Sequence, residues 1–466
     1  MISTANIVLF MTSTVDFGAS YVYDLPQSMA IAFDEKLGYD DGKCLLFYSA
    51  YSFPNLFINL LGSWFINKFG FRKCLVGYSL LVVLGNGVFV LGAAQNSYIT
   101  MIIGRIIQGT GAENLMITQY YTSHKFFKDT YLSLAMGLDM SFSYAASAIS
   151  FYLAPWIYLT SGSLNLSLIL SSIPTVISLC AAITLALKFN TDQKVNSAIE
   201  KINAEVRNET EKLKSSSEET AQLENPPEIV DNYDIEIQDI DHSKTKNFKF
   251  ADLKKFPAVF WIICGIAFLD STAYFAFIGV STRLVSVKYK ISYDDAKKVP
   301  LIVPFLQMLL IPVLTKIVYH KGGKPLYLVA GSVIGMFAFL VIILGPNLSP
   351  YIGVVLVGLF YTCHSSSFWP SAAIASEASH VDMGLGIVNT MQNLSNFLVP
   401  IILGSRFEKI TEDNVDDYLK VLIFLLFIGF ILSTALFLID RSKGGQLYEP
   451  DETRKHRDES TSEPLK

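Results

Sequence analysis

The stretch Gly104-Arg105-Ile106-Ile107-Gln108-Gly109-Thr110-Gly111-Ala112-Glu113-Asn114 lies inside a long apolar segment that runs from Ser97 to about Tyr121. It places an arginine and a glutamate where a membrane interior is expected. A charge at the centre of a bilayer costs at least about 2.5–3.5 kcal/mol on insertion scales. These side chains must therefore face a protein interior or a wet cavity. The small residues of the stretch let a neighbouring helix approach closely.

The composition indicates a membrane protein with many spans. Of the 466 residues, 51% are hydrophobic and only 17% are charged, whereas a soluble domain has about 25% charged residues. No basic face with interleaved aromatics is present, which argues against nucleic-acid binding. The five cysteines are scattered and form no CxxC, so we expect buried structural thiols. No metal-ligand spacing, phosphate loop or nucleophile motif occurs, which predicts no metal, no cofactor and no enzyme.

Apolar stretches of membrane-spanning length occur twelve times. They lie near 5–31, 44–66, 74–94, 97–121, 132–158, 164–188, 257–284, 298–319, 325–345, 350–376, 383–404 and 418–439. We therefore predict a six-helix bundle over 1–188, a partly helical or disordered acidic linker over 189–256, a second six-helix bundle over 257–440 and a disordered tail over 441–466. The linker and tail are expected in the cytosol. The first stretch lacks a basic start and a small-residue cleavage site, so we interpret it as a retained span.

The two sets of six resemble each other weakly. The turn between the second and third spans aligns with the turn between the eighth and ninth at one constant offset. Asn67 matches His320, Lys68 matches Lys321 and Gly70 matches Gly323. A repeated unit of this kind is typical of transporters built from two halves around a midplane site. The short loops on the two sides of the membrane carry nearly equal numbers of lysine and arginine residues. The long loop adds lysines to the side that holds both termini, so we expect that side in the cytosol.

Two motifs resemble those of the major facilitator superfamily. One is the basic turn with Gly62, Gly70, Arg72 and Lys73. The other is Arg105-x-x-Gln108-Gly109-x-Gly111-Ala112 in the fourth span. The resemblance implies an all-α membrane fold of twelve helices in two pseudo-symmetric six-helix bundles. Asn67 and His320 depart from the pattern, because aspartates are usual there.

A longer series of motifs resembles the lysosomal dipeptide-transporting branch of that superfamily. It comprises Tyr23-Asp24-Leu-Pro26, Tyr48-Ser-Ala-Tyr51-Ser52-Phe-Pro54-Asn55, Gly111-Ala-Glu113-Asn-Leu115, Phe127-Lys128, Phe275-Ala-Phe277-Ile278-Gly279, Trp369-Pro370, Gln392-Asn393-Leu394 and Asp440-Arg441-x-x-Gly444-Gly445. The resemblance implies facilitative (uniport) export of dipeptides, with a preference for cationic side chains, from lysosome lumen to cytosol. It also implies a glycosylated accessory membrane protein as partner. The expected location is a lysosome or another acidic endomembrane compartment, with the plasma membrane as the alternative. The sequence does not decide whether the protein forms a homodimer.

The same resemblance assigns roles to two residues. Glu113 matches an acid of the fourth helix that faces the substrate. Tyr144 stands where an arginine is expected to hold the peptide carboxylate, and a tyrosine hydroxyl has neither the charge nor the bidentate fork of a guanidinium. Asp270 stands where an aromatic is usual.

The residues themselves leave alternatives open. Glu113 either contacts a substrate cation, pairs with Arg105, or is a protonated structural acid. Arg105, which we expect near the cytosolic side, either ties the fourth helix to a neighbour or takes part in coupling. Further acids would favour cationic substrates by making the cavity acidic; these are Asp24, Asp139 and Asp270, whereas Asp16 is expected near a membrane face. Side chains that could stack on or hydrogen-bond a peptide, or else join helices, are Tyr48, His364, Trp369, Gln392 and Asn393.

Two other functions remain. The first is a proton-coupled carrier of amino acids or other small solutes, which the extra acids Asp139 and Asp270 favour. The second is a non-transporting sensor or scaffold of the same fold. It predicts that no dipeptide or amino acid stabilises the protein against heat.

Overall fold

The computed structural model describes residues 4–126, 129–188, 250–345, 348–376, 381–451 and 453. Every regular element within these ranges is a helix, so the all-α class is confirmed. The predicted linker lies outside the described residues up to position 249, and so does the tail from position 454. The side chains of Gly62 and Asn67 also lie outside them.

The first half supplies six passes of helix. The first pass is broken into α1 (Thr4–Val15), α2 (Phe17–Tyr23) and α3 (Leu25–Ser28), and the short α4 (Ala30–Leu37) follows. The second pass is α5 (Asp41–Ser52) and α6 (Asn55–Phe69). Three long helices come next: α7 (Phe71–Ala94), α8 (Tyr98–Phe126) and α9 (Asp129–Ser161). The sixth pass is α10 (Leu164–Leu170) with the helical residues 173–188.

The second half repeats this plan after the short 3₁₀ helix η2 (Phe250–Lys255). Its passes are α12 (Ala258–Ile278) with α13 (Ser281–Tyr289), α15 (Ile302–Lys321), α16 (Lys324–Leu344), α17 (Pro350–Ala375), α18 (Val381–Arg406) and α19 (Val415–Ser442), and α14 (Tyr293–Ala296) lies beyond α13. In the described ranges, seven helices are long and apolar enough to cross a membrane. The remaining predicted spans are either interrupted by helix breaks or contain more polar side chains. These polar side chains face the protein interior.

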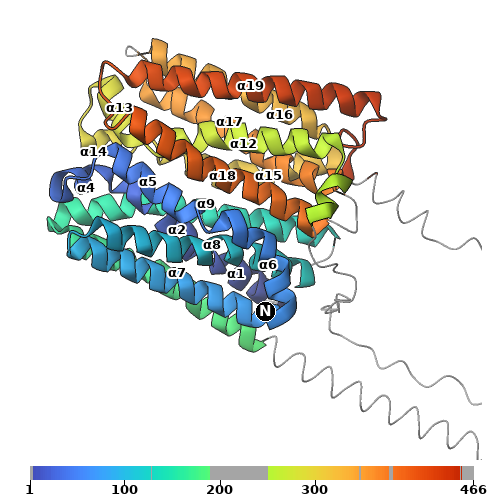
Figure 1. Ribbon diagram of the computed structural model, residues 1–466, viewed down its shortest axis with the longest axis horizontal. Helices are drawn as coiled ribbons and strands as arrows, with labels where there is room; N and C mark the ends of the chain where they lie inside the picture. The colour runs from blue at the N-terminus through green and yellow to red at the C-terminus, as the bar shows by residue number, and fades with distance from the viewer. Residues whose placement is uncertain are drawn as a thin grey trace, which may run out of the picture.

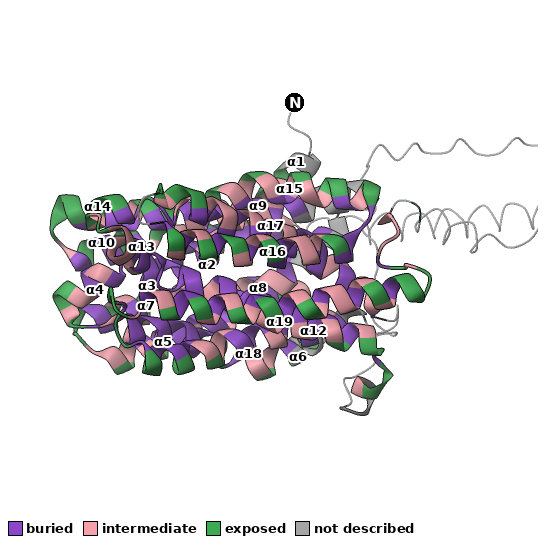
Figure 2. Ribbon diagram, turned by 90° about the horizontal axis from the view of Figure 1, so that it is seen from above, coloured by how far each residue is buried: buried purple, intermediate pink, exposed green. Residues whose placement is uncertain are grey.

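The two halves lie side by side with their helices roughly parallel (Figure 1). Helix α5 packs against α18 and α9 packs against α15, so these two pairs join the halves. Buried residues face inward and exposed residues face outward along most helices (Figure 2). Many of the outward residues are large and apolar, for example Phe57, Leu187, Phe424 and Leu438, which suits contact with lipid tails.

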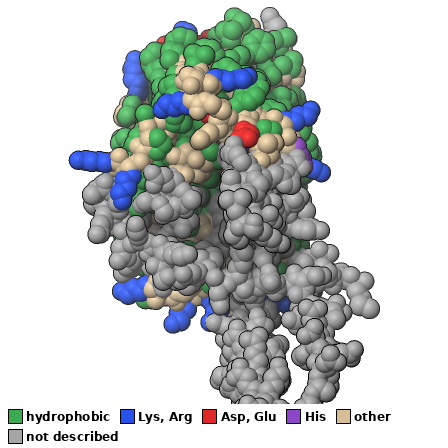
Figure 3. Space-filling view, turned by 90° about the vertical axis from the view of Figure 1, so that its right-hand side faces the viewer, with side chains coloured by type: hydrophobic (Ala, Val, Ile, Leu, Met, Phe, Trp, Pro, Cys, Tyr) green, Lys and Arg blue, Asp and Glu red, His purple; other side chains and the backbone are tan. Residues whose placement is uncertain are grey.

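Figure 3 faces the right-hand end of Figure 1 and shows Lys and Arg side chains spread around it. This is the end at which α6 finishes and α7 begins. The sequence predicts that this end is cytosolic.

The glycines of α8 allow the close approach that the sequence predicts. A Cβ atom added at Gly109 would overlap the backbone carbonyl of Tyr51 in α5, and one at Gly111 would lie 2.7 Å from the Tyr78 carbonyl oxygen in α7. Because the obstructing atoms belong to the backbone, a rotamer change cannot relieve either contact. These glycines therefore fix α8 against two neighbours.

We expect Gly109→Ala to destabilise the protein by about 1–3 kcal/mol, because the added methyl group must push α8 away from α5. A thermal unfolding scan of the purified protein should show a lower apparent melting temperature. Gly77→Ala is the matched control, since a Cβ at Gly77 in α7 meets no atom within 4 Å and alanine favours a helix. Equal melting temperatures for the two variants would contradict the packing role of Gly109.

Candidate substrate site

A cavity lies between the two halves. Its volume is about 190 Å³, room on the order of ten water molecules, which suits a small solute. The first half lines it mainly from α2, α8 and α9, and the second half mainly from α12, α17 and α18. The cavity thus occupies the position predicted for a midplane site between repeats.

Two of the lining acids come from breaks in the first pass. Asp16 separates α1 from α2, and Asp24 separates α2 from α3. The Asp16 carboxylate accepts hydrogen bonds from the hydroxyls of Ser20 and Ser143, each 2.9 Å long. The prediction that Asp16 lies near a membrane face is wrong. The helix is interrupted at this residue, and the two serines hold its carboxylate inside the protein.

Glu113 is the third lining acid and joins the halves. Its Oε2 accepts a hydrogen bond of 3.2 Å from Nδ2 of Asn393 in α18. The Tyr51 hydroxyl and the Asn389 amide lie beside the same carboxyl group. The alternative that Glu113 pairs with Arg105 is not what the structure shows. Glu113 therefore links α8 of the first half to α18 of the second half at the cavity.

Arg105 is 1% exposed and ties helices together. Its guanidinium donates to the backbone carbonyls of Val22 and Tyr23, at 3.0 Å each, and to Oε1 of Gln108 at 2.6 Å. It also lies 5.0 Å from the centre of the Tyr51 ring. This geometry favours the structural alternative, because Arg105 donates to two backbone carbonyls at the break between α2 and α3 and so ties α8 to it.

The expectation that Arg105 lies near the cytosolic side is wrong. Helix α8 begins at the opposite end of the molecule, where the hydroxyl of Tyr98 donates to the Lys43 carbonyl over 2.9 Å. Arg105 comes two turns after that start.

The structure brings most of the predicted site residues together. Predicted residues that line the cavity are Asp24, Glu113, Tyr144, Trp369, Gln392 and Asn393. The Gln392 side-chain amide also donates a hydrogen bond of 2.9 Å to the Ser271 hydroxyl. Part of its hydrogen-bonding capacity is therefore already used within the protein.

Four predicted residues, Tyr48, Asp139, Asp270 and His364, are not among the lining residues. Asp139 accepts hydrogen bonds from Ser13 and Ser123, at 2.8 and 2.7 Å, and so links α9 to α1 and α8. Asp270 is buried against His364, with 3.2 Å between its Oδ2 and Nδ1 of the imidazole. The Tyr48 ring packs against the Arg105 guanidinium at 5.6 Å.

Several lining residues were not predicted as site residues: Tyr51, Tyr274, Phe275, Tyr361, Ser365, Asn389 and Asn396. One signal could have found two of them. Asn389, Gln392, Asn393 and Asn396 follow the spacing i, i+3, i+4, i+7 of one helical face. Such a row of amides within an apolar segment indicates an interior surface that offers hydrogen bonds.

The basic-turn motif is an element of the fold and lies away from the cavity. Gly70 ends α6 and precedes α7 with a φ of 81°, and Gly323 precedes α16 with a φ of 82°. Both conformations favour glycine over residues with a side chain. The two glycines share a positive φ and a place between two passes, which agrees with the predicted repeat, although their ψ angles of 141° and 21° differ.

Two bundles of six passes around an interior polar cavity are typical of membrane transporters. The model of the Major Facilitator Superfamily matches residues 7–400, and the chain belongs to this family. It is thus a transporter and not an enzyme.

Among curated proteins, the chain is similar to the lysosomal dipeptide transporter MFSD1 of several vertebrates. It is 24% identical to the Bos taurus and Homo sapiens proteins over 451 residues, which cover 95% of this chain and 87% of each relative. The Mus musculus protein is also 24% identical, over 460 residues.

Proposed function

We propose that this protein is a facilitative transporter that carries dipeptides with cationic side chains from the lumen of a lysosome to the cytosol. The observation that carries the proposal is the cavity between the halves, which Asp16, Asp24 and Glu113 line. A cavity with this charge attracts cations and repels anions. The name of the similar vertebrate transporters supports both the dipeptide and the compartment. The accessory membrane protein and the homodimer remain predictions.

The experiment is uptake by purified protein in liposomes, with lysyl-alanine, alanyl-alanine and aspartyl-alanine as substrates and no ion gradient. We expect the lysyl peptide to be taken up fastest and the aspartyl peptide slowest. Heat stabilisation by each peptide should follow the same order. If none of the three peptides is taken up, the proposal is contradicted. If none of them stabilises the protein against heat, the sensor or scaffold is favoured.

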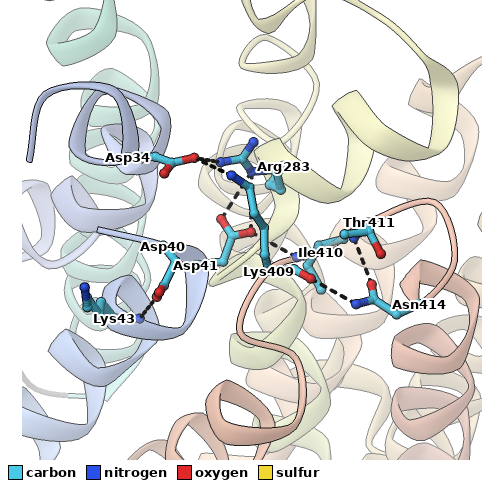
Figure 4. A network of polar contacts seen from close by, with 9 residues as sticks. All are labelled: Asp34, Asp40, Asp41, Lys43, Arg283, Lys409, Ile410, Thr411 and Asn414. Carbon is cyan, nitrogen blue, oxygen red and sulfur yellow. Dashed lines mark hydrogen bonds and ion pairs between the residues drawn. The ribbon is translucent and has the colours of Figure 1, made fainter. Parts of the chain in front are cut away.

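A network of charges joins the halves at the left-hand end of Figure 1 and supports transport by rocking. Figure 4 shows Asp34 of α4 and Asp41 of α5 directed toward Arg283 of α13. The Arg283 guanidinium lies 2.5 Å from Asp34 and 3.4 Å from Asp41. Lys409, just after α18, also lies 3.1 Å from Asp34. We infer that this network is the lumenal gate, closed in this structure.

The gate is expected to tolerate an acidic lumen. Partial desolvation raises the pKa of Asp34, but hydrogen bonds from Lys409 and Arg283 outweigh it, so that the pKa lies below its ordinary value. Asp34 therefore keeps its negative charge until the pH falls below about 3.9. Above that pH its ion pairs continue to stabilise the closed gate. Burial raises the pKa of Asp41, although Arg283 opposes this. Because the carboxyl group of Asp41 binds a proton more readily when the gate is closed, a lower pH favours the closed gate through this residue.

We predict that Asp34→Asn opens the gate, whereas a change from pH 7 to pH 5 does not. Spin labels at the exposed positions Lys36 and Glu408 would report the distance across the gate by electron–electron double resonance. The variant should show a longer distance at pH 7, and the unsubstituted gate should show the same distance at both pH values. Asp417→Asn is the control, because Asp417 pairs with Lys420 within one half. Opening of the unsubstituted gate at pH 5 would contradict the prediction.

One observation favours proton coupling as a second candidate function. Asp270 and His364 are 0% and 1% exposed, and Ser332 donates to the same carboxylate oxygen over 3.3 Å. Within the described residues, Asp270 Oδ1 and His364 Nε2 have no hydrogen-bond partner. A buried carboxyl and imidazole in contact could hold one proton between them. His364 adjoins Ser365, which lines the cavity, so a proton here could influence binding.

This candidate predicts a result that uniport excludes. A proton gradient alone would drive concentrative uptake of lysyl-alanine into liposomes, and His364→Gln would remove that drive while leaving exchange of internal for external peptide intact. If a proton gradient leaves uptake unchanged, proton coupling is rejected.

A further inference from the structure

The charges around the cavity are of one sign. Its lining includes the carboxyl groups of Asp16, Asp24 and Glu113. It includes no lysine, arginine or histidine, as far as the described part of the chain extends. A zwitterionic peptide offers an ammonium group, which these acids can bind, and a carboxylate, which they repel. The cavity therefore matches one end of a free dipeptide and not the other.

Arg105 does not supply the missing cation. It lies close enough to Asp24 to interact with it electrostatically, but its guanidinium already donates to Val22, Tyr23 and Gln108. It is also 1% exposed and surrounded by aromatic rings. A substrate carboxylate could reach it only by displacing these bonds.

The balance of charge leaves room for two positive charges. With Arg105 offsetting one acid, two of the three carboxyl groups have no cation beside them. Asp16 and Glu113 are near enough to repel each other when both are ionised. Buried carboxyl groups in such a pair ionise together only when cations accompany them. A ligand with two cationic groups would provide those cations, whereas a ligand with a carboxylate would add a further negative charge.

The wall from the second half is neutral. Tyr274 and Tyr361 stack with 3.6 Å between ring centres, and Trp369 lies on the same wall. Because the contacting faces of Tyr274 and Tyr361 cover each other, the Trp369 ring offers an aromatic face on this wall that can attract a second cationic group. The Asn389 amide lines this wall too, beside the Glu113 carboxyl group. The polar side chains of this wall are amides and hydroxyls, which can hydrogen-bond a neutral amide of a ligand, so the wall suits a ligand without a carboxylate.

We propose that the site recognises organic dications and does not recognise a carboxylate. C-terminally amidated dipeptides with a cationic side chain, and linear diamines of similar length, are then ligands in their own right. This inference rests on the proposed function only in placing the ligand in the same cavity.

The test is a thermal-shift and competition titration of the full-length protein with three probes. They are lysyl-alanine as the free acid, lysyl-alanine amide and 1,8-diaminooctane. We expect the amide to bind at least as tightly as the free acid, and the diamine to displace both. A free acid that binds more than threefold tighter than the amide would overturn the inference, because it would reveal a cation that captures the carboxylate.

The outcomes separate this inference from the proposed function. Binding of the amide and the diamine without the free acid supports the inference and rejects the free dipeptide, whereas failure of the amide to bind overturns the inference. Binding of the peptides without the diamine rejects the inference and leaves the dipeptide. If none of the three binds, both are rejected.

A substitution at Tyr144 gives an independent test. Its hydroxyl lines the cavity and lies beside Ser365. Tyr144→Arg places a guanidinium on the wall, so we expect it to shift the ratio of affinities at least tenfold toward the free acid and to weaken diamine binding. Tyr144→Phe is the matched control, since it removes the hydroxyl and adds no charge, and should leave the ratio within threefold. An unchanged ratio in a folded Tyr144→Arg protein would overturn the inference.

Discussion

Glu113→Gln is expected to abolish uptake of lysyl dipeptides and to leave the protein folded. The substitution keeps the shape and the hydrogen bond from Asn393, but it removes the charge that faces a cationic ligand. Loss of one partner of a buried ion pair costs roughly 3–5 kcal/mol, which is about a 10²- to 4 × 10³-fold loss of affinity. Uptake into liposomes and the melting temperature without ligand are the two measurements.

Glu113→Asp tests whether the charge or its position matters. It retains the carboxylate on a shorter side chain, so we expect weak uptake that higher peptide concentrations restore. Glu412→Gln is the surface control, because Glu412 is 64% exposed and pairs with Lys290. Ordinary uptake by Glu113→Gln would remove Glu113 from the site.

Arg105→Lys is expected to have the largest effect on stability. An ammonium on a flexible stem cannot replace a guanidinium that bonds two carbonyls and Gln108 in one plane. If both carbonyls, those of Val22 and Tyr23, lose their donors, the cost is roughly 2–6 kcal/mol, since each unsatisfied buried group costs about 1–3 kcal/mol. The apparent melting temperature should fall strongly in the absence of any ligand.

This result would separate the structural role of Arg105 from a role in coupling. Arg72→Lys is the matched control at the start of α7, away from the cavity lining. A melting temperature for Arg105→Lys equal to that of the unsubstituted protein, together with lost proton- or substrate-driven uptake, would favour coupling.

The fold could be predicted because its signals are local. Apolar runs of membrane-spanning length mark the passes, and glycines such as Gly70 and Gly109 mark the positions where backbone must turn or approach. The charge argument on Glu113 also depends on one helix only, since an acid in a membrane span must find an interior surface. These features need no knowledge of which helices are neighbours.

The rest of the site depends on contacts between distant segments. Asp139 and Asp270 carry the same signal as Glu113, yet serines from α1 and α8 surround the first and His364 lies beside the second. Nothing in their own helices distinguishes them from a lining acid. The position of Asp16 depends on a break within the first pass and on Ser143 of α9, and neither follows from the apolar pattern of its own span. The pairing of Asp34 with Arg283 likewise joins residues from opposite halves.

The hydrogen bond between Glu113 and Asn393 has a kinetic consequence. It connects α8 to α18 in the empty protein, and a cationic ligand would compete for the same carboxylate. The empty carrier must break this bond unaided whenever it reorients, whereas the loaded carrier has already exchanged it. Reorientation without cargo should then be the slow step of the cycle. Substrate on the receiving side of the membrane would bind the carrier before it returns, and so would increase the rate of transport from the first side. Asn393→Ala would reduce this increase.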